Sequence, residues 1–98
     1  MTFRHRSITT KTLDWRGFFV QVTFERQRFV DHLQIETLEP QRAPLPITET
    51  GYRSHFISKG VIDDFGSPGD YVLAWLEQSA ANKGWHEIEA GIRQLSLF

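Results

Sequence analysis

The chain has 98 residues, the length of a single domain, and 40% of them are apolar. Three tryptophans and eight phenylalanines supply large side chains for one hydrophobic core. The absence of cysteine excludes disulfides, a zinc-thiolate site and a thiol nucleophile, and it fits a reducing cytoplasm. A net charge of −1 provides no general field that would attract nucleic acid or an anionic membrane.

Neither an export signal nor a membrane span is expected. The basic N-terminus is followed by the polar residues Thr9, Thr10 and Lys11, where a signal peptide would need an apolar run. Every apolar stretch falls far short of the ~20 residues that cross a bilayer. We therefore expect a cytoplasmic protein.

The first half of the chain predicts an antiparallel β-meander. Residues 18–25 alternate and so form a strand with one apolar face, which consists of Phe18, Val20, Val22 and Phe24. Residues 7–13 precede a turn at 14–17 that ends in glycine, which indicates a hairpin. Residues 32–38 predict a third strand with Leu33 and Ile35 facing inward.

Residues 39–51 contain three of the four prolines, which disfavour both helix and central strand. This pattern predicts a stiff, extended crossing. Residues 52–57 then alternate again and predict a short fourth strand at the sheet edge.

After residue 57 the apolar period becomes helical. Ser58 is expected to cap a short helix that ends at Gly66 and carries Val61, Ile62 and Phe65. A second helix should begin at Ser67-Pro68-Gly69-Asp70, with serine as cap and proline at the first helical position. Its expected buried stripe comprises Val72, Trp75, Leu76 and Ala80. A last helix should place Trp85, Ile88 and Ile92 on one face.

These patterns together predict an α+β fold. Three to four strands form an antiparallel β-meander, and two or three C-terminal helices pack on one face of it. Residues 1–93 would form the single domain, and residues 94–98 a tail.

Catalytic and metal-binding motifs are not recognisable. The histidines are scattered and none has a partner at helical metal-site spacing. Asp63 and Asp64 are adjacent, so on a helix their carboxylates diverge and are expected to form a solvated face. We therefore predict a protein that is not an enzyme and needs no metal or cofactor.

Residues 48–56 form the densest cluster of hydrogen-bonding side chains. As a functional loop and strand edge, this segment would offer Glu49, Arg53 and His55 to a protein partner. In the alternative interpretation, Tyr52 and Phe56 pack in the interior while Arg53 and His55 line an exposed edge.

A small basic patch is a further candidate. It would join the arginines and histidine of residues 4–6 to Arg26 and Arg28 across the predicted hairpin. Nucleic acid binding would require more positive charge with aromatic residues between the basic ones, so the near-neutral chain argues against it.

The last five residues, Gln94, Leu95, Ser96, Leu97 and Phe98, resemble the pentapeptide Gln-Leu-(Ser/Asp)-Leu-Phe. Bacterial polymerases, mismatch-repair proteins and replication regulators use that peptide to dock on the DNA sliding clamp. The resemblance implies that these residues bind the clamp. An apolar pair at a free chain end can enter a partner's pocket without unfolding the domain.

The tail also has a structural interpretation. Leu95 lies three residues after Ile92 and continues the apolar stripe of the last helix. Leu97 and Phe98 would then fold back on the sheet as a hydrophobic plug. The sequence leaves both interpretations open.

Most of the chain is similar to small proteins of proteobacterial plasmids and integrative elements. The residues that carry this resemblance are Asp14-Trp15-Arg16-Gly17, the run from Ala43 to Phe56, and Ser96-Leu97-Phe98. It implies a mobile-element setting and brings no activity with it.

The first hypothesis is therefore a mobile-element adaptor or regulator that docks on the host clamp. The second is an accessory protein that binds a host defence or conjugation protein through the Tyr52–Phe56 edge, with a purely structural tail. The third is a small nucleic-acid-binding protein.

Overall fold

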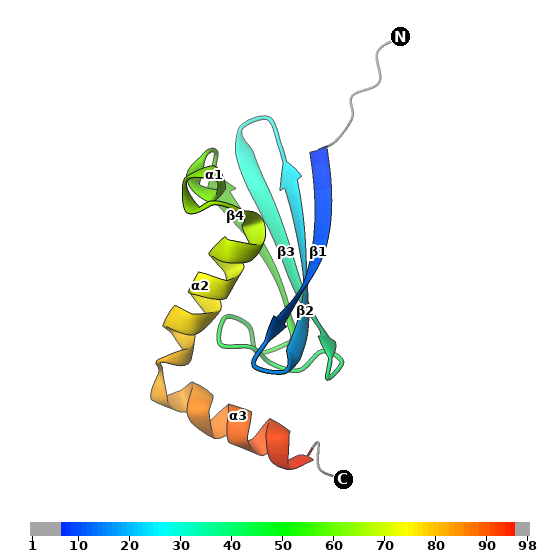
Figure 1. The fold of residues 1–98 in the computed structure, drawn as a ribbon, viewed down its shortest axis with the longest axis vertical. Coiled ribbons are helices and arrows are strands. Elements are labelled where there is room, and N and C mark those ends of the chain that lie inside the picture. Colours follow the sequence, from blue (N-terminus) through cyan, green and yellow to red (C-terminus); the bar gives the residue numbers. More distant parts are fainter. Residues whose placement is uncertain (1–6, 96–98) are drawn as a thin grey trace.

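The computed structural model describes residues 7–95 and consists of one sheet followed by three helices (Figure 1). The antiparallel sheet has the strand order β1-β2-β3-β4. Its strands are β1 (Ser7–Trp15), β2 (Phe18–Arg26), β3 (Val30–Glu39) and β4 (Tyr52–Ser58). The helices are α1 (Val61–Phe65), α2 (Pro68–Ala80) and α3 (Lys83–Leu95). The predicted α+β meander is confirmed.

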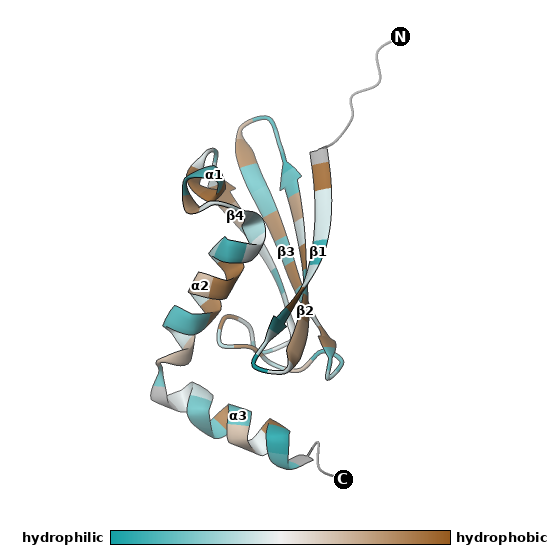
Figure 2. Cartoon of the chain, viewed as in Figure 1, coloured by the Kyte–Doolittle hydropathy of each residue, from teal (hydrophilic) through white to brown (hydrophobic). Residues whose placement is uncertain are grey.

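The two faces of the sheet have different environments because alternate side chains point to opposite sides. The predicted inward residues are buried, with Val20, Leu33 and Ile35 at 0% exposure. α2 covers this face with its apolar side, which Figure 2 shows in brown toward the sheet. The opposite face carries mainly threonine, glutamine and glutamate, together with the exposed aromatic residues Phe19 and Phe56.

The β1–β2 hairpin turns at Arg16 and Gly17, as the sequence predicts. Both residues have positive φ, 52° and 85°, and the carboxylate of Asp14 accepts a hydrogen bond from the Gly17 N–H at 3.0 Å. Trp15 lies next to this turn and packs against Phe18 and Trp85 at ring-centroid distances of 5.9 and 5.7 Å. The turn is therefore in contact with both the sheet core and α3.

The prediction of a stiff, extended crossing between β3 and β4 was wrong. Residues 40–51 fold into turns, and the backbones of Leu45 and Thr48 exchange hydrogen bonds of 2.8 and 3.0 Å. Three apolar side chains of this loop enter the core: Ala43, Leu45 and Ile47. Their burial favours a folded loop over an extended one, because an extended chain would leave these side chains in water.

The expected Ser58 cap of α1 was also wrong. Gly60 in a left-handed conformation with φ 89° is the N-cap, and no side chain caps the helix. The five-residue helix buries only Ile62, while Val61 and Phe65 remain 37% and 51% exposed. The end at Gly66 is as predicted.

The predicted start of α2 is confirmed. Ser67 is the N-cap, its hydroxyl accepts a hydrogen bond from the Asp70 N–H at 3.1 Å, and Pro68 is the first helical residue. Val72, Leu76 and Ala80 are buried as expected, whereas Trp75 is half-buried.

The predicted apolar face of α3 is only partly correct. Trp85 is buried and Ile92 is half-buried, but Ile88 is 45% exposed. Glu89 occupies the buried position instead, and its carboxylate pairs with Arg16 at 3.3 Å and Arg93 at 2.9 Å. The two arginines compensate the cost of burying this charge. Apolar periodicity alone cannot predict such a buried ion pair.

Gly51 is predicted to be indispensable for the loop before β4. Its φ is +76°, and a Cβ built there would lie 2.5 Å from the backbone carbonyl of Arg42. Gly17 also has positive φ, but a Cβ there meets nothing within 4 Å. In urea unfolding, Gly51→Ala should therefore destabilise the protein well beyond the ~1 to 2 kcal/mol of left-handed strain expected for Gly17→Ala. Equal losses in the two variants would contradict the close packing of Gly51.

Glu89 is predicted to make the protein sensitive to acid. Burial alone would raise the pKa of Glu89, but the hydrogen bond from Arg93 and the charge of Arg16 lower it below the usual 4.5. Its stabilisation is therefore present above about pH 4.5 and is lost as the pH falls through the lowered pKa. Glu89→Gln should cost on the order of 1 kcal/mol at pH 7 and should flatten the acid limb of a stability-pH curve. Glu87→Gln, on the exposed side of the same helix, is the matched control and should leave the acid limb unchanged.

Candidate functional site

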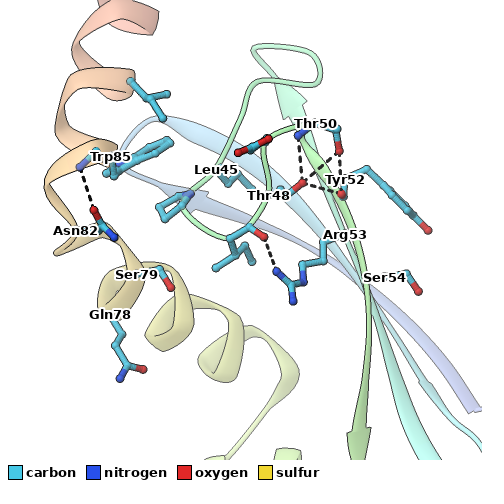
Figure 3. A pocket seen from close by; sticks show the side chains of 15 residues that line it. Leu45, Thr48, Thr50, Tyr52, Arg53, Ser54, Gln78, Ser79, Asn82 and Trp85 are labelled. Carbon is cyan, nitrogen blue, oxygen red and sulfur yellow. Dashed lines mark hydrogen bonds between the residues drawn. The ribbon is translucent and has the colours of Figure 1, made fainter.

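A groove of about 890 Å³ lies between the loop before β4 and the helices α2 and α3 (Figure 3). Leu45, Thr48 and Glu49 line it from the loop, and Tyr52, Arg53 and Ser54 from β4. Gln78, Ser79 and Asn82 line it from α2 and the following turn, and Trp85 and Ile88 from α3. It is larger than the hollow beside β1, of about 230 Å³, and the hollow beside Phe18, of about 490 Å³.

Threonine hydroxyls hold the loop against the start of β4. Thr48 Oγ1 donates to the carbonyl oxygen of Tyr52 at 2.8 Å, and Thr50 Oγ1 donates to the same oxygen at 3.1 Å (Figure 3). The loop wall of the groove is therefore held to β4 by two side-chain hydrogen bonds. The end of the loop is also bonded to β3, because the Gly51 carbonyl accepts a hydrogen bond from the Thr37 N–H.

Arg53 and His55 lie together on the helix-facing side of β4, around Trp75 of α2. The Arg53 guanidinium donates to the carbonyl of Ile47 at 2.8 Å, and its Cζ lies 4.9 Å from the centre of the Trp75 ring. The His55 ring lies 4.6 Å from that of Trp75. Burial, followed by the charges of Arg53 and His32, lowers the pKa of His55 below its usual 6.5. Arg53 therefore presents a positive charge at the groove wall.

Tyr52 and Phe56 lie on the open face of the sheet, so the alternative interpretation, in which these two side chains pack, was wrong. Phe56 is 60% exposed and stacks on His32 at 4.5 Å, and Tyr52 is 36% exposed. Their side chains lie on the face away from the helices because β4 pairs in register with β3, with Phe56 opposite His32. Glu49 lies in the loop, exposed and apart from the Trp75 cluster.

The groove residues of the helices were not recognised in the sequence. Gln78, Asn82, Trp85 and Ile88 belong to ordinary helical patterns and converge with β4 only through the fold. The indole N–H of Trp85 is buried without a hydrogen-bond partner among residues 7–95. The sequence predicted Trp85 only as part of one face of the last helix, and its unpaired donor becomes visible only in the structure.

The structure describes the candidate docking peptide in part. Gln94 is exposed in the last turn of α3, which ends at Leu95. Ser96, Leu97 and Phe98 lie outside the described residues. Gln94 also borders a second hollow of about 490 Å³, together with Phe18, Pro40 and Ile92.

The remaining candidates show simple surface contacts. Arg26 and Asp63 form a bidentate ion pair at 2.9 and 2.7 Å, and the hydrogen bonds from Arg26 lower the pKa of the Asp63 carboxyl. The arginines and histidine of residues 4–6 lie outside the described range. Within residues 7–95, no group of three or more acidic or histidine side chains could hold a metal ion, and no helix is long and apolar enough to cross a membrane.

A comparison with protein families matches residues 8–85 to the KlcB third domain. This range includes more than half of the chain. The chain belongs to the KlcB third-domain family. KlcB is a plasmid-associated protein, so the family relates this chain to a plasmid-associated accessory protein. Comparisons with curated proteins and with solved structures gave no match.

The KlcB family range includes all four strands, α1, α2 and the groove residues up to Trp85. It ends before most of α3, so the pentapeptide 94–98 lies outside it. The groove therefore belongs to the part of the chain that defines the family, whereas the pentapeptide is a separate feature.

The pKa of His55 is predicted to depend on Arg53. In Arg53→Gln the nearby positive charge is lost, and the pKa of His55 should rise toward 6.5. Histidine ring resonances followed by NMR between pH 4 and 8 measure this change. Arg28→Gln, which removes an exposed arginine in the β2–β3 turn, is the control and should leave His55 unchanged. An unchanged His55 in both variants would show that Arg53 and His55 do not share the Trp75 cluster.

Proposed function

We propose that this chain is a non-enzymatic adaptor or regulator of a mobile genetic element that docks on the host DNA sliding clamp through residues 94–98. The observation that carries the proposal is the pentapeptide Gln94-Leu95-Ser96-Leu97-Phe98 at the end of α3. The relation to a plasmid-associated protein supports a setting in which an element engages host replication.

The position of the peptide is compatible with docking. Gln94 is exposed, and its amide has both donors and acceptors for a partner. Gln94 and Leu95 form the end of α3, where the last carbonyls lack helical partners and the turn opens at little cost. The sheet and α2 can therefore keep their structure while the last residues bind.

The apolar pair sets the expected affinity. Burying Leu97 and Phe98 in a pocket contributes a gross ~3 to 6 kcal/mol before the cost of ordering the peptide. Binding by the tail alone should consequently be on the order of micromolar at best.

Titration with purified bacterial sliding clamp, followed by calorimetry, tests the proposal. The wild-type chain should bind, and a Leu97→Ala, Phe98→Ala variant should lose at least about tenfold in affinity because it loses the apolar pair. Phe29→Ala is the matched control, since Phe29 is an aromatic residue 79% exposed in the distant β2–β3 turn.

Two results would contradict clamp docking. One is equal binding by the wild type and the double variant, and the other is the absence of binding by both. In the structural alternative, Leu97 and Phe98 fill the hollow beside Phe18 and Ile92. That alternative predicts a loss of folding stability in the double variant with no clamp binding by the wild type.

The groove beside β4 favours a second candidate function. It combines a charged wall at Arg53 with an apolar end, and its lining residues except Ile88 lie within the range that matches the family. Such a site supports an accessory protein that binds a host defence or conjugation protein through the Tyr52–Phe56 edge. This function would be retained after deletion of residues 94–98 and reduced by Arg53→Ala in a binding assay with the partner.

A further inference from the structure

We infer that β4 binds an extended acidic segment of a partner protein as a fifth strand of the sheet. The inference rests on the second candidate function and gives its binding mode and the chemistry of the partner. It does not depend on clamp docking by the tail.

The first observation is the direction of the backbone groups of β4. Thr37 pairs with Gly51 through the Thr37 N–H and the Gly51 carbonyl, so the hydrogen-bonded pairs of this register continue at every second residue. Arg53, His55 and Ile57 therefore bond to β3. The backbone N–H and C=O groups of Ser54 and Phe56 point away from it, toward the free edge.

The contacts of Tyr52 support this assignment. Its carbonyl also points to the free edge, and there it accepts the Thr48 and Thr50 hydroxyls instead of a strand. Within residues 7–95, no hydrogen bond reaches the edge-facing groups of Ser54 or Phe56. The threonines close the edge at its beginning, and it remains open from Ser54 onward.

The second observation is the available space. The groove of about 890 Å³ lies between β4 and α2, with Tyr52, Arg53 and Ser54 on the strand side and Gln78 and Ser79 on the helix side. The hollow beside the other edge strand, β1, is about 230 Å³, and residues 67–69 at the start of α2 border it. A partner strand with side chains has this larger space beside β4.

The third observation is charge. β4 has no acidic residue, and Arg53 stands at the groove wall on the side that faces the helices, while Glu49 lines the groove from the loop before β4. The side chains of an added strand alternate like those of β4, so every second one would lie on the helix-facing side, and the one opposite Arg53 would face this guanidinium. A carboxylate there forms a charge-assisted hydrogen bond with the donors of Arg53 that Ile47 leaves free.

The β4 strand of a second copy brings no negative charge to Arg53. In an antiparallel pair of two β4 strands centred on residue 53, two Arg53 side chains would lie directly opposite each other. Like charges directly opposite each other destabilise a strand pair. An acidic partner segment avoids this repulsion.

Binding can be measured with two blocked octapeptides, one alternating valine with glutamate and the other valine with lysine. In NMR titrations with the full chain, the glutamate peptide should bind about threefold to tenfold more tightly, and Arg53→Gln should abolish the preference. Arg28→Gln is the control and should retain it. The Leu97→Ala, Phe98→Ala variant should also retain it, which separates this result from the outcome of the clamp experiment.

Hydrogen exchange identifies the binding mode. The glutamate peptide should slow exchange at the amides of Ser54 and Phe56 and leave the amides of β1 unchanged. Ser54→Pro removes an edge-facing donor and breaks no backbone bond to β3, although it also removes the hydrogen bond between the Ser54 hydroxyl and His32, so it should fold and lose peptide binding. If Ser54→Pro fails to fold, the exchange data on the wild-type chain decide.

Three results would overturn the inference. The first is peptide binding with unchanged exchange at Ser54 and Phe56, which would place the peptide in the groove without strand addition. The second is equal affinity for both peptides. The third is protection of the Ser54 and Phe56 amides that rises with protein concentration and accompanies dimer formation in sedimentation, which would make a second copy the occupant.

Discussion

The arrangement of this molecule depends on the contacts of the β1–β2 turn with both long helices. Trp15 donates its indole N–H to Glu77 of α2 at 2.8 Å, and Arg16 pairs with Glu77 at 3.0 Å and with Glu89 of α3 at 3.3 Å. Arg93 of α3 donates to the Arg16 carbonyl at 2.9 Å. One turn of the sheet therefore orients α2 and α3, and the angle between these helices shapes the groove.

The groove depends on this arrangement of the helices because three separate parts of the chain line it: the loop before β4, β4 itself, and the helices α2 and α3. The loop before β4 enters the core through Leu45 and Ile47, and its threonine hydroxyls bond to Tyr52. Arg53 and His55 lie on the helix-facing side of β4 because they pair opposite the inward residues Ile35 and Leu33, and Trp75 of α2 packs beside them. β4 is the last strand of the sheet, so its outer edge lies next to the groove. The groove thus arises from an ordinary meander and the helices that follow it.

The two proposed binding sites lie at different parts of the chain and would bind through different kinds of interaction. The pentapeptide would bind through two apolar side chains, so its affinity depends on burial. The β4 edge belongs to the sheet and would bind through main-chain hydrogen bonds, so its selectivity depends on the charge beside it. An adaptor with both could join two partners, because the first turns of α3 border the β4 groove whereas Gln94 in its last turn borders a separate hollow.

Local patterns by themselves determined the strands, the start of α2 and the inward residues of the sheet. Period-two alternation in residues 18–25 and the Ser67-Pro68 cap act through neighbouring residues, so no distant contact was needed to predict them. Tertiary contacts decided the rest. Glu89 is buried because Arg16, 73 positions away in the chain, pairs with it, and Arg53 meets Trp75 because the register of β4 with β3 places it on the face that α2 covers. The loop folds inward because Leu45 and Ile47 find a core there, and only the assembled sheet and helices create that core.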